Sequence, residues 1–322
     1  MATLVDLSSP AIVGNFYDML DVQFDASWSS EVGFQFFNSS QPSETYKMLG
    51  SVPKFSEWLG GRNIKKPKVD SFTIINRLFE QTVGIPVDDL RRDKTGQIVA
   101  RLGELAQAGA YHWEDLLTAL MNANATNTYD GVAFFGTTHP IAESTTGSTT
   151  AKNLITATEV PALNIGTATA PTAAEAALIV TGLVGHMFTF QNDQGFYVNR
   201  GAKSWLIMVA TTAQLAAYSV AISGQNTSVD VANPVRGLLA MGHTFRVELN
   251  PGLTSSTDMV YLFRRDGRVK PFILQQEFAP KVTVLGEGSD HAFKNREHLF
   301  GTEVSRNSGY GCWYHALKAQ MS

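Results

Sequence analysis

A single long amphipathic stripe in residues 93–123 constrains the fold more than any other feature of this sequence. Six apolar residues recur there at spacings of three and four on either side of Gly109: Ile98, Leu102, Leu105, Trp113, Leu116 and Leu120. That period is typical of an α-helix with one apolar face. Gly109 lies on the same stripe, so we expect another element to approach the helix closely there. Either Asp93 or Thr95 is a candidate cap for the helix start.

The residues before this helix lack the regular pattern of an independent core. In residues 1–45, aromatic side chains are interrupted by Ser and Asn without a lasting period. This favours an arm that lies on something else. Residues 62–88 alternate in a way that predicts extended β structure, as at Phe72 and Ile74. Because an isolated hairpin is only marginally stable in water, we expect this one to need a partner, which another subunit could supply.

Residues 143–177 are rich in Thr, Ala, Ser and Gly, which marks a boundary or a long surface excursion. The patterns beyond it predict alternating helices and strands: a helix at 173–184, a buried strand at 203–209, a helix at 213–223, and strands at 237–249 and 260–263. This order indicates an α/β subdomain inserted between two parts of another domain.

The last fifty or so residues are rich in β patterns. We expect strands at 271–277, 299–306 and 310–317, with Asn307, Ser308 and Gly309 forming a hairpin turn between the last two. The final strand carries bulky residues on both faces, which predicts that both faces are covered.

Composition narrows the function classes. The net charge of −4 provides no basic field that would hold nucleic acid, although it is compatible with a container for DNA. The single cysteine, Cys312, excludes an intrachain disulfide framework and is expected to be buried. No signal peptide and no membrane-spanning apolar run is evident, so we expect synthesis and retention in a cytoplasm, with no membrane partner.

Motifs for catalysis are missing from the sequence. It contains no GxSxG nucleophile elbow and no GxxxxGK[ST] phosphate loop, and its seven histidines form no metal-ligating pair. His139 and Asp290-His291 are the best metal candidates by residue type, but isolated positions of this kind are more often structural. The expectation is therefore no catalytic residue, no cofactor and no metal.

Several blocks of the sequence resemble the Mu-like bacteriophage major head subunit family. The central block, residues 129–140, runs from Tyr129-Asp-Gly through Phe134-Phe135 to His139-Pro140. The upstream blocks include Glu57-Trp58-Leu-Gly-Gly-Arg62. The downstream blocks include Lys270-Pro271-Phe and Asn307-Ser-Gly309-Tyr-Gly311-Cys-Trp313. Together such blocks cover about half of the chain, in a shared order. Gly136 and Thr137-Thr138 stand where the family often has acidic residues, so we interpret this block as a turn packed under the long helix.

The resemblance implies an α+β, Hong Kong 97-like capsid fold and a major capsid protein. The implied parts are an N-terminal arm (1–45), an E-loop hairpin and its base (46–92), a peripheral (P) domain with the spine helix (93–154), an axial (A) domain (155–265), and a β-rich return to the P domain (266–322). The implied partners are other copies of the chain in pentamers and hexamers, a separate scaffold and maturation protease, a portal, and packaged double-stranded DNA bound without sequence specificity. The implied location is the virion, after assembly in the bacterial host cytoplasm.

Seven residues are candidates for contacts between subunits: Trp58, Arg62, Lys65, Lys66, Lys68, Arg91 and Arg92. All of them except Arg62 have a plainer interpretation. The tryptophan precedes a Gly pair and would anchor a turn, the lysines would guard a strand edge, and the paired arginines would form local salt bridges. Alternative functions remain open at this point. These are an encapsulin-type nanocompartment shell of the same fold, a tail-tube or other virion protein, and a metal-dependent cytoplasmic hydrolase.

Overall fold

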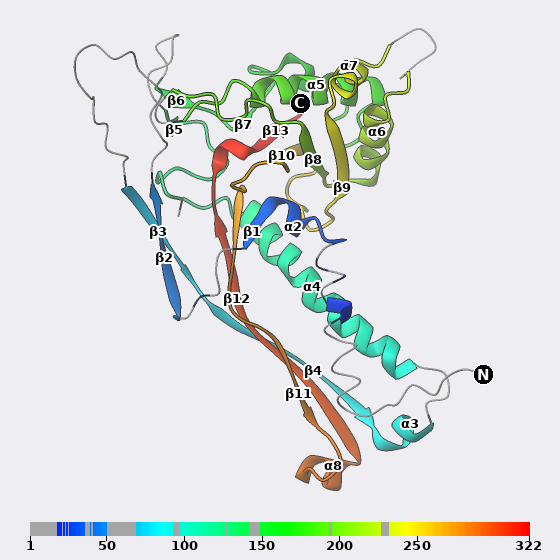
Figure 1. The fold of residues 1–322 in the computed structure, drawn as a ribbon. Helices are drawn as coiled ribbons and strands as arrows, with labels where there is room; N and C mark the ends of the chain where they lie inside the picture. Colours follow the sequence, from blue (N-terminus) through cyan, green and yellow to red (C-terminus); the bar gives the residue numbers. More distant parts are fainter. Residues whose placement is uncertain are drawn as a thin grey trace.

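The computed structural model describes residues 18–20, 22, 24, 26–35, 39, 41–49, 69–92, 97–126, 128–141, 149–192, 195–226 and 232–322. It is an α+β fold with two main sheets, and a long helix lies beside one of them (Figure 1). The helices are α2 (Ser29–Val32), α3 (Val87–Arg92), α4 (Gln97–Ala123), α5 (Ala173–Met187), α6 (Thr212–Ile222), α7 (Val235–Ala240) and α8 (Asp290–Asn295), with short 3₁₀ turns η1 (Pro161–Leu163) and η2 (Trp313–His315).

A four-stranded sheet with the order β1-β11-β12-β4 lies along α4. Its strands are β1 (Gly33–Gln35), β4 (Arg77–Pro86), β11 (Phe272–Leu285) and β12 (Glu297–Tyr310). At about 3.3 Å per residue, the two 14-residue strands β11 and β12 each extend roughly 46 Å. They form an antiparallel pair, interrupted by register shifts between Gln276 and Lys281, and α8 connects them at the far tip.

The predicted long helix is confirmed as α4, although its most buried line differs slightly from the expected stripe. Leu105 and Trp113 are buried as predicted, but beyond Trp113 the fully buried positions are Leu117 and Met121. Leu116 and Leu120 are partly buried against the same core. The side chains of Ile98 and Leu102 and the cap candidates Asp93 and Thr95 lie outside the described residues.

A five-stranded sheet with the order β7-β13-β10-β8-β9 forms the second unit, packed with α5 and α6. Its strands are β7 (Leu154–Ile155), β13 (Ala316–Gln320), β10 (Met259–Arg264), β8 (Ser204–Val209) and β9 (Thr244–Leu249). Capping boxes at Thr172/Glu175 and Thr211/Gln214 satisfy the first free N–H groups of the two helices. The predicted helices and buried strand of this region are confirmed, but the strand expected at 237–249 is wrong in its first part, which belongs to α7.

The extended segment before α4 is not one hairpin. β3 (Val69–Ile75) pairs antiparallel with β2 (Ser43–Leu49), whereas β4 turns away to pair with β12. The strand partner of β3 is therefore an earlier segment of the same chain, which the sequence pattern did not reveal. Figure 1 shows the β2/β3 hairpin standing beside the long sheet rather than inside it.

The predicted turn at Asn307–Gly309 is wrong. These residues continue β12 and pair with Gln275, Leu274 and Ile273 of β11. The last strand, β13, also lies elsewhere than expected, because it enters the five-stranded sheet between β7 and β10. The prediction that the end of the chain is covered on both faces is confirmed at Cys312, Trp313 and Leu317, all of which are buried.

Part of the expected N-terminal arm packs on its own chain. Trp28 and Val32 are buried in the main core, and β1 runs parallel to β11 at Gly33–Gln35. Glu31 forms ion pairs with Arg246 and Arg265, 2.8 Å and 2.5 Å long, which tie this segment to the five-stranded sheet. For residues 27–35, the arm therefore lies on the rest of its own chain.

Candidate functional site

The block that carries the family resemblance folds around a buried polar centre, formed by Asp130, His139, Asn153 and Trp313. The His139 side chain is fully buried. Its Nδ1 lies 2.7 Å from Asp130 Oδ2, and its Nε2 lies 3.1 Å from Asn153 Oδ1. The ring stacks on Trp313 with 4.3 Å between centroids. Both ring nitrogens thus face oxygen acceptors, and both bonds form only when each nitrogen carries a hydrogen.

Asn153 links this polar centre to two separate stretches of backbone. Its Nδ2 donates to the carbonyls of Phe134, Trp313 and Ala316, while its Oδ1 accepts from the Gly136 amide at 2.8 Å. An apolar residue at this position would leave several buried backbone groups without partners, which is costly. Asn153 therefore ties the turn after α4 to the start of the last strand.

The turn also closes the C-terminal end of α4. Asn124, in a left-handed conformation with φ of 42°, exchanges two hydrogen bonds with the backbone of Phe135. The Tyr310 hydroxyl donates to the Leu120 carbonyl and accepts from the Ala125 amide. These bonds satisfy groups that a helix end leaves free. The interpretation of residues 129–140 as a turn packed at the long helix is confirmed.

The polar centre has the chemistry of a structural site. A histidine paired with an aspartate resembles part of a catalytic triad, but the ring is enclosed and no serine, threonine or cysteine side chain hydrogen-bonds to it among the described residues. The described residues also contain no group of three or more His, Cys, Asp or Glu side chains placed to hold a metal ion. Nor do they include a helix that is both long enough and apolar enough to cross a membrane.

We expect Asp130→Asn to make the free energy of unfolding less sensitive to acid. Burial raises the pKa of Asp130, but hydrogen bonds from His139, Thr128 and the Val132 amide outweigh it and hold the pKa below the ordinary 3.8. The ionised carboxylate therefore stabilises the fold fully above about pH 4, and that contribution disappears as the pH falls through the lower folded-state pKa. At pH 7 the free energy of unfolding of wild type should exceed that of the variant by about 1–3 kcal/mol.

Urea unfolding between pH 7 and pH 3 measures this difference, which should shrink below pH 4. The matched control is Asp115→Asn, which replaces an exposed carboxylate on α4 and should track wild type at every pH. A gap between wild type and Asp130→Asn that stayed constant down to pH 3 would contradict the assignment.

A second group of side chains forms the hairpin base, where β2/β3 meets the long sheet. It consists of Tyr46, Ile74, Asn76, Gln275 and Asn307. The fully buried Gln275 side chain accepts from the Tyr46 hydroxyl at 2.8 Å and donates to Asn76 Oδ1 at 2.6 Å and the Ile74 carbonyl at 3.3 Å. Asn307 Nδ2 donates to the Ile75 carbonyl at 2.7 Å. Side chains of the long sheet thus hold the hairpin and its end through both backbone and side-chain groups.

The apolar contact beneath the hairpin base is small. Its buried members are Phe72, Ile74 and Ile273. Gly309 makes the approach possible, because a Cβ at this position would lie 2.3 Å from Ile74 Cδ1. The hairpin therefore depends on a few polar contacts and one close backbone approach to set its direction relative to the long sheet.

The side chains of all seven predicted contact residues lie outside the described residues. Trp58, Arg62, Lys65, Lys66 and Lys68 belong to residues 50–68, which connect β2 to β3 and lie outside the described residues. Arg91 and Arg92 end α3, and their side chains are also outside the described part. These contacts stay predictions.

Sequence reasoning missed the hairpin base. The signal available for Gln275 was a polar residue that directly follows the apolar run Phe272–Leu274 within a predicted strand. The signal at Asn307 and Gly309 was misread as a turn. Of the metal candidates, His139 belongs to the polar centre. Asp290 pairs with Lys294 along α8, and His291 lies 3.4 Å from Glu297.

This architecture defines the class. A long helix beside a long-stranded sheet, a second α/β sheet and a projecting hairpin make up the Hong Kong 97-like fold of phage capsid proteins. The capsid protein of cyanophage P-SCSP1u superposes with a TM-score of 0.52 at 13% identity, over 90% of this chain and 86% of that one. A virus-like particle protein from Pyrococcus furiosus superposes with a TM-score of 0.51 at 8% identity, over 97% and 98%. At such identities these likenesses show the fold alone.

The chain belongs to the Mu-like prophage major head subunit gpT family, whose profile matches residues 16–168 and 187–322. It is 35% identical to the major capsid protein of Escherichia phage Mu over 117 residues, which is 36% of this chain. The match spans 38% of the length of the phage Mu protein.

Proposed function

We propose that this chain is a major capsid protein that assembles with copies of itself into the icosahedral head shell of a Mu-like phage. Family membership and the fold support this function. In the proposal the subunits form pentamers and hexamers, and the shell encloses packaged double-stranded DNA without reading its sequence. The role is structural rather than enzymatic.

One observation carries the assembly proposal: the β2/β3 hairpin stands off the body with very little core of its own. Its contact with the long sheet buries only three apolar side chains, Phe72 and Ile74 of β3 and Ile273 of β11, and an isolated two-stranded hairpin is marginal in water. A neighbouring subunit beneath the hairpin would supply the missing contact. Weak single contacts then add up through multivalency, and misplaced subunits can still leave.

We divide the shell subunit as the resemblance implies, with one change at its end. The proposed parts are the arm (1–45), the E-loop hairpin and its base (46–92), the P domain (93–154 and 266–322) and the A domain (155–265). The pairing of β13 with β7 and β10 favours assigning the last strand to the A-domain sheet. The proposed helpers are a separate scaffold, a maturation protease and a portal, with assembly in the bacterial host cytoplasm and a final place in the virion.

Electron microscopy of the purified full-length chain, alone and co-expressed with the scaffold of the same phage, tests the proposal. We expect closed icosahedral particles when both are present. Open tubes or single rings would support a tail component instead and would overturn the capsid role. Closed particles that contain a cargo enzyme and lack nucleic acid in infected cells would favour the nanocompartment alternative.

A further inference from the structure

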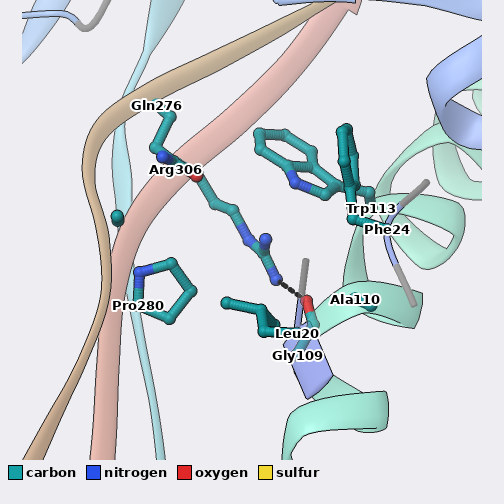
Figure 2. Close-up of a pocket in the computed structure, with 9 residues that line it drawn as sticks. Leu20, Phe24, Gly109, Ala110, Trp113, Gln276, Pro280 and Arg306 are labelled. Carbon is teal, nitrogen blue, oxygen red and sulfur yellow. Dashed lines mark hydrogen bonds between the residues drawn. The ribbon is translucent and has the colours of Figure 1, made fainter. Parts of the chain in front are cut away.

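Two bodies meet in this chain: the first is α4 with the long sheet, and the second is the five-stranded sheet with α5 and α6. Direct contacts between helix and sheet hold the first body together. Arg306 of β12 donates from Nε to His112 Nδ1 at 2.9 Å and from Nη2 to the Gly109 carbonyl, so its side chain crosses from the sheet to the helix (Figure 2). Leu105 of α4 packs with Phe300 of β12 in a small apolar cluster. We therefore expect α4 and the long sheet to move together.

Two connections between the bodies, residues 265–271 and 311–315, run side by side. The Gly311 amide donates to the Pro271 carbonyl at 2.8 Å. The bodies also share one apolar core. Apolar attraction holds them together but is non-directional, so it does not by itself define the angle between them. Directed polar contacts are therefore the candidates for fixing that angle.

Residues 27–35, here called the brace, supply such contacts to the second body. Glu31 pairs with Arg265 at 2.5 Å and with Arg246 at 2.8 Å. Arg246 lies on β9, and the Arg265 amide donates to the Ser204 carbonyl of β8 at 2.8 Å, so both arginines belong to the five-stranded sheet. Arg265 also begins the first of the two connections. Glu31 therefore holds the second body at the point where the chain leaves it.

The other attachments of the brace are to the first body. The Ser27 hydroxyl donates to Glu114 Oε1 on α4 at 2.6 Å. At the opposite end of the brace, β1 pairs with β11 from Gly33 to Gln35. Between them, Trp28 is buried in the shared core. A short segment that is fixed to one body at both ends, and to the other through Glu31 in its middle, has the geometry of a strut.

The ion pairs of Glu31 contribute direction more than stability. The Arg265 and Glu31 side chains are 26% and 16% exposed, and the cost of removing partly buried charges from water offsets much of their attraction. Charged hydrogen bonds nonetheless require a defined geometry. Arg246 also pairs with Glu248, so it keeps a partner when Glu31 is replaced. Loss of Glu31 should therefore change the angle between the bodies without unfolding the chain.

We propose that Glu31 sets the angle between the two bodies, as a positioning residue that acts through Arg265 and Arg246. Without it, the bodies stay joined by the shared core but sample a wider range of angles. In the proposed shell, a narrow range of angles limits the curvature with which copies join. That consequence rests on the proposed function, whereas the brace itself does not.

Pulsed electron paramagnetic resonance on the unassembled full-length subunit measures this angle through the distance between two spin labels. Ala108→Cys on α4 and Ser219→Cys on α6 place one label on each body, and both positions are exposed. Cys312 is buried, and burial raises its pKa to about 12, so the native thiol stays unlabelled. The labelled subunit with an intact brace should give one narrow distance distribution.

Glu31→Ala should widen that distribution about twofold, because the bodies then sample more angles. Arg265→Met should widen it as well. The double variant should widen it no further than the broader single variant, because the two changes remove the same contact. Circular dichroism should show a folded chain in each case. If Glu31→Ala fails to fold, Arg265→Met alone provides the same test.

The matched control is Glu159→Ala. The Glu159 side chain is 15% exposed, close to the 16% of Glu31, and it pairs with Lys152 inside the second body. Its removal should leave the distance distribution narrow. A narrow distribution in both Glu31→Ala and Arg265→Met overturns the proposal, and so does equal widening in Glu159→Ala. Because the measurement uses unassembled protein, the brace can fail while the capsid role stands, and the reverse also holds.

Discussion

Trp313→Ala should lower the free energy of unfolding of the unassembled subunit by about 3–5 kcal/mol. The Trp313 side chain is 2% exposed. It stacks on His139 and makes an edge contact with Phe190 at 5.6 Å between centroids. Removing the indole leaves a cavity and also uncovers the buried Asp130–His139 pair. The loss therefore combines a packing effect with a polar one.

Urea unfolding followed by circular dichroism measures this effect. Phe293→Ala is the control, because Phe293 on α8 is 86% exposed and its truncation should change the free energy by less than about 0.5 kcal/mol. Trp313→Phe should fall between wild type and Trp313→Ala. A loss below about 1 kcal/mol for Trp313→Ala would show that the polar centre does not depend on this ring.

Gly309→Val should leave the subunit folded but abolish closed shells. Because a Cβ at Gly309 would lie 2.3 Å from Ile74 Cδ1 and 2.8 Å from its Cγ1, valine must push the buried Ile74 side chain out of this contact, and we expect β3 to shift with it. Overpacking of this kind typically costs about 1–3 kcal/mol, which a domain of this size can tolerate. The displaced hairpin would no longer point where a neighbouring subunit can accept it.

Gly301→Ala is the matched control for Gly309→Val. It lies on the same strand, and its Cβ would meet nothing closer than Thr82 Oγ1 at 3.4 Å. Both variants should elute as soluble subunits, and the fraction in closed particles can be measured by sedimentation and electron microscopy. Normal shells from Gly309→Val would refute the idea that the hairpin base controls assembly.

Elements that depend on local pattern could be predicted from the sequence. The α4 stripe repeats apolar residues at helical spacing over enough turns to be distinctive. The pairing of β3 with β2 could not be predicted in this way, because about 20 residues separate the strands and the alternation within β3 does not identify its partner. Long-range pairing depends on which surfaces fit, and a local pattern does not contain that information.

The error at Asn307–Gly309 has a physical explanation. Asn and Gly are typical of turns, but here each has a different use within a continuous strand. Asn307 donates its side-chain amide to the Ile75 carbonyl, and Gly309 makes room for the Ile74 side chain. The turn-like sequence Asn307-Ser308-Gly309 therefore results here from a close crossing of two sheets. In a single sequence, an Asn or Gly that such a crossing requires looks the same as an Asn or Gly that a turn requires.

The position of β13 has a consequence for the order of events on the ribosome. This strand lies inside the five-stranded sheet, between β7 and β10, yet every other strand of that sheet is synthesised before it. Until residues 316–320 emerge, β10 has an open edge and the sheet is divided into two parts. The two parts of this sheet can therefore join only after β13 has been synthesised.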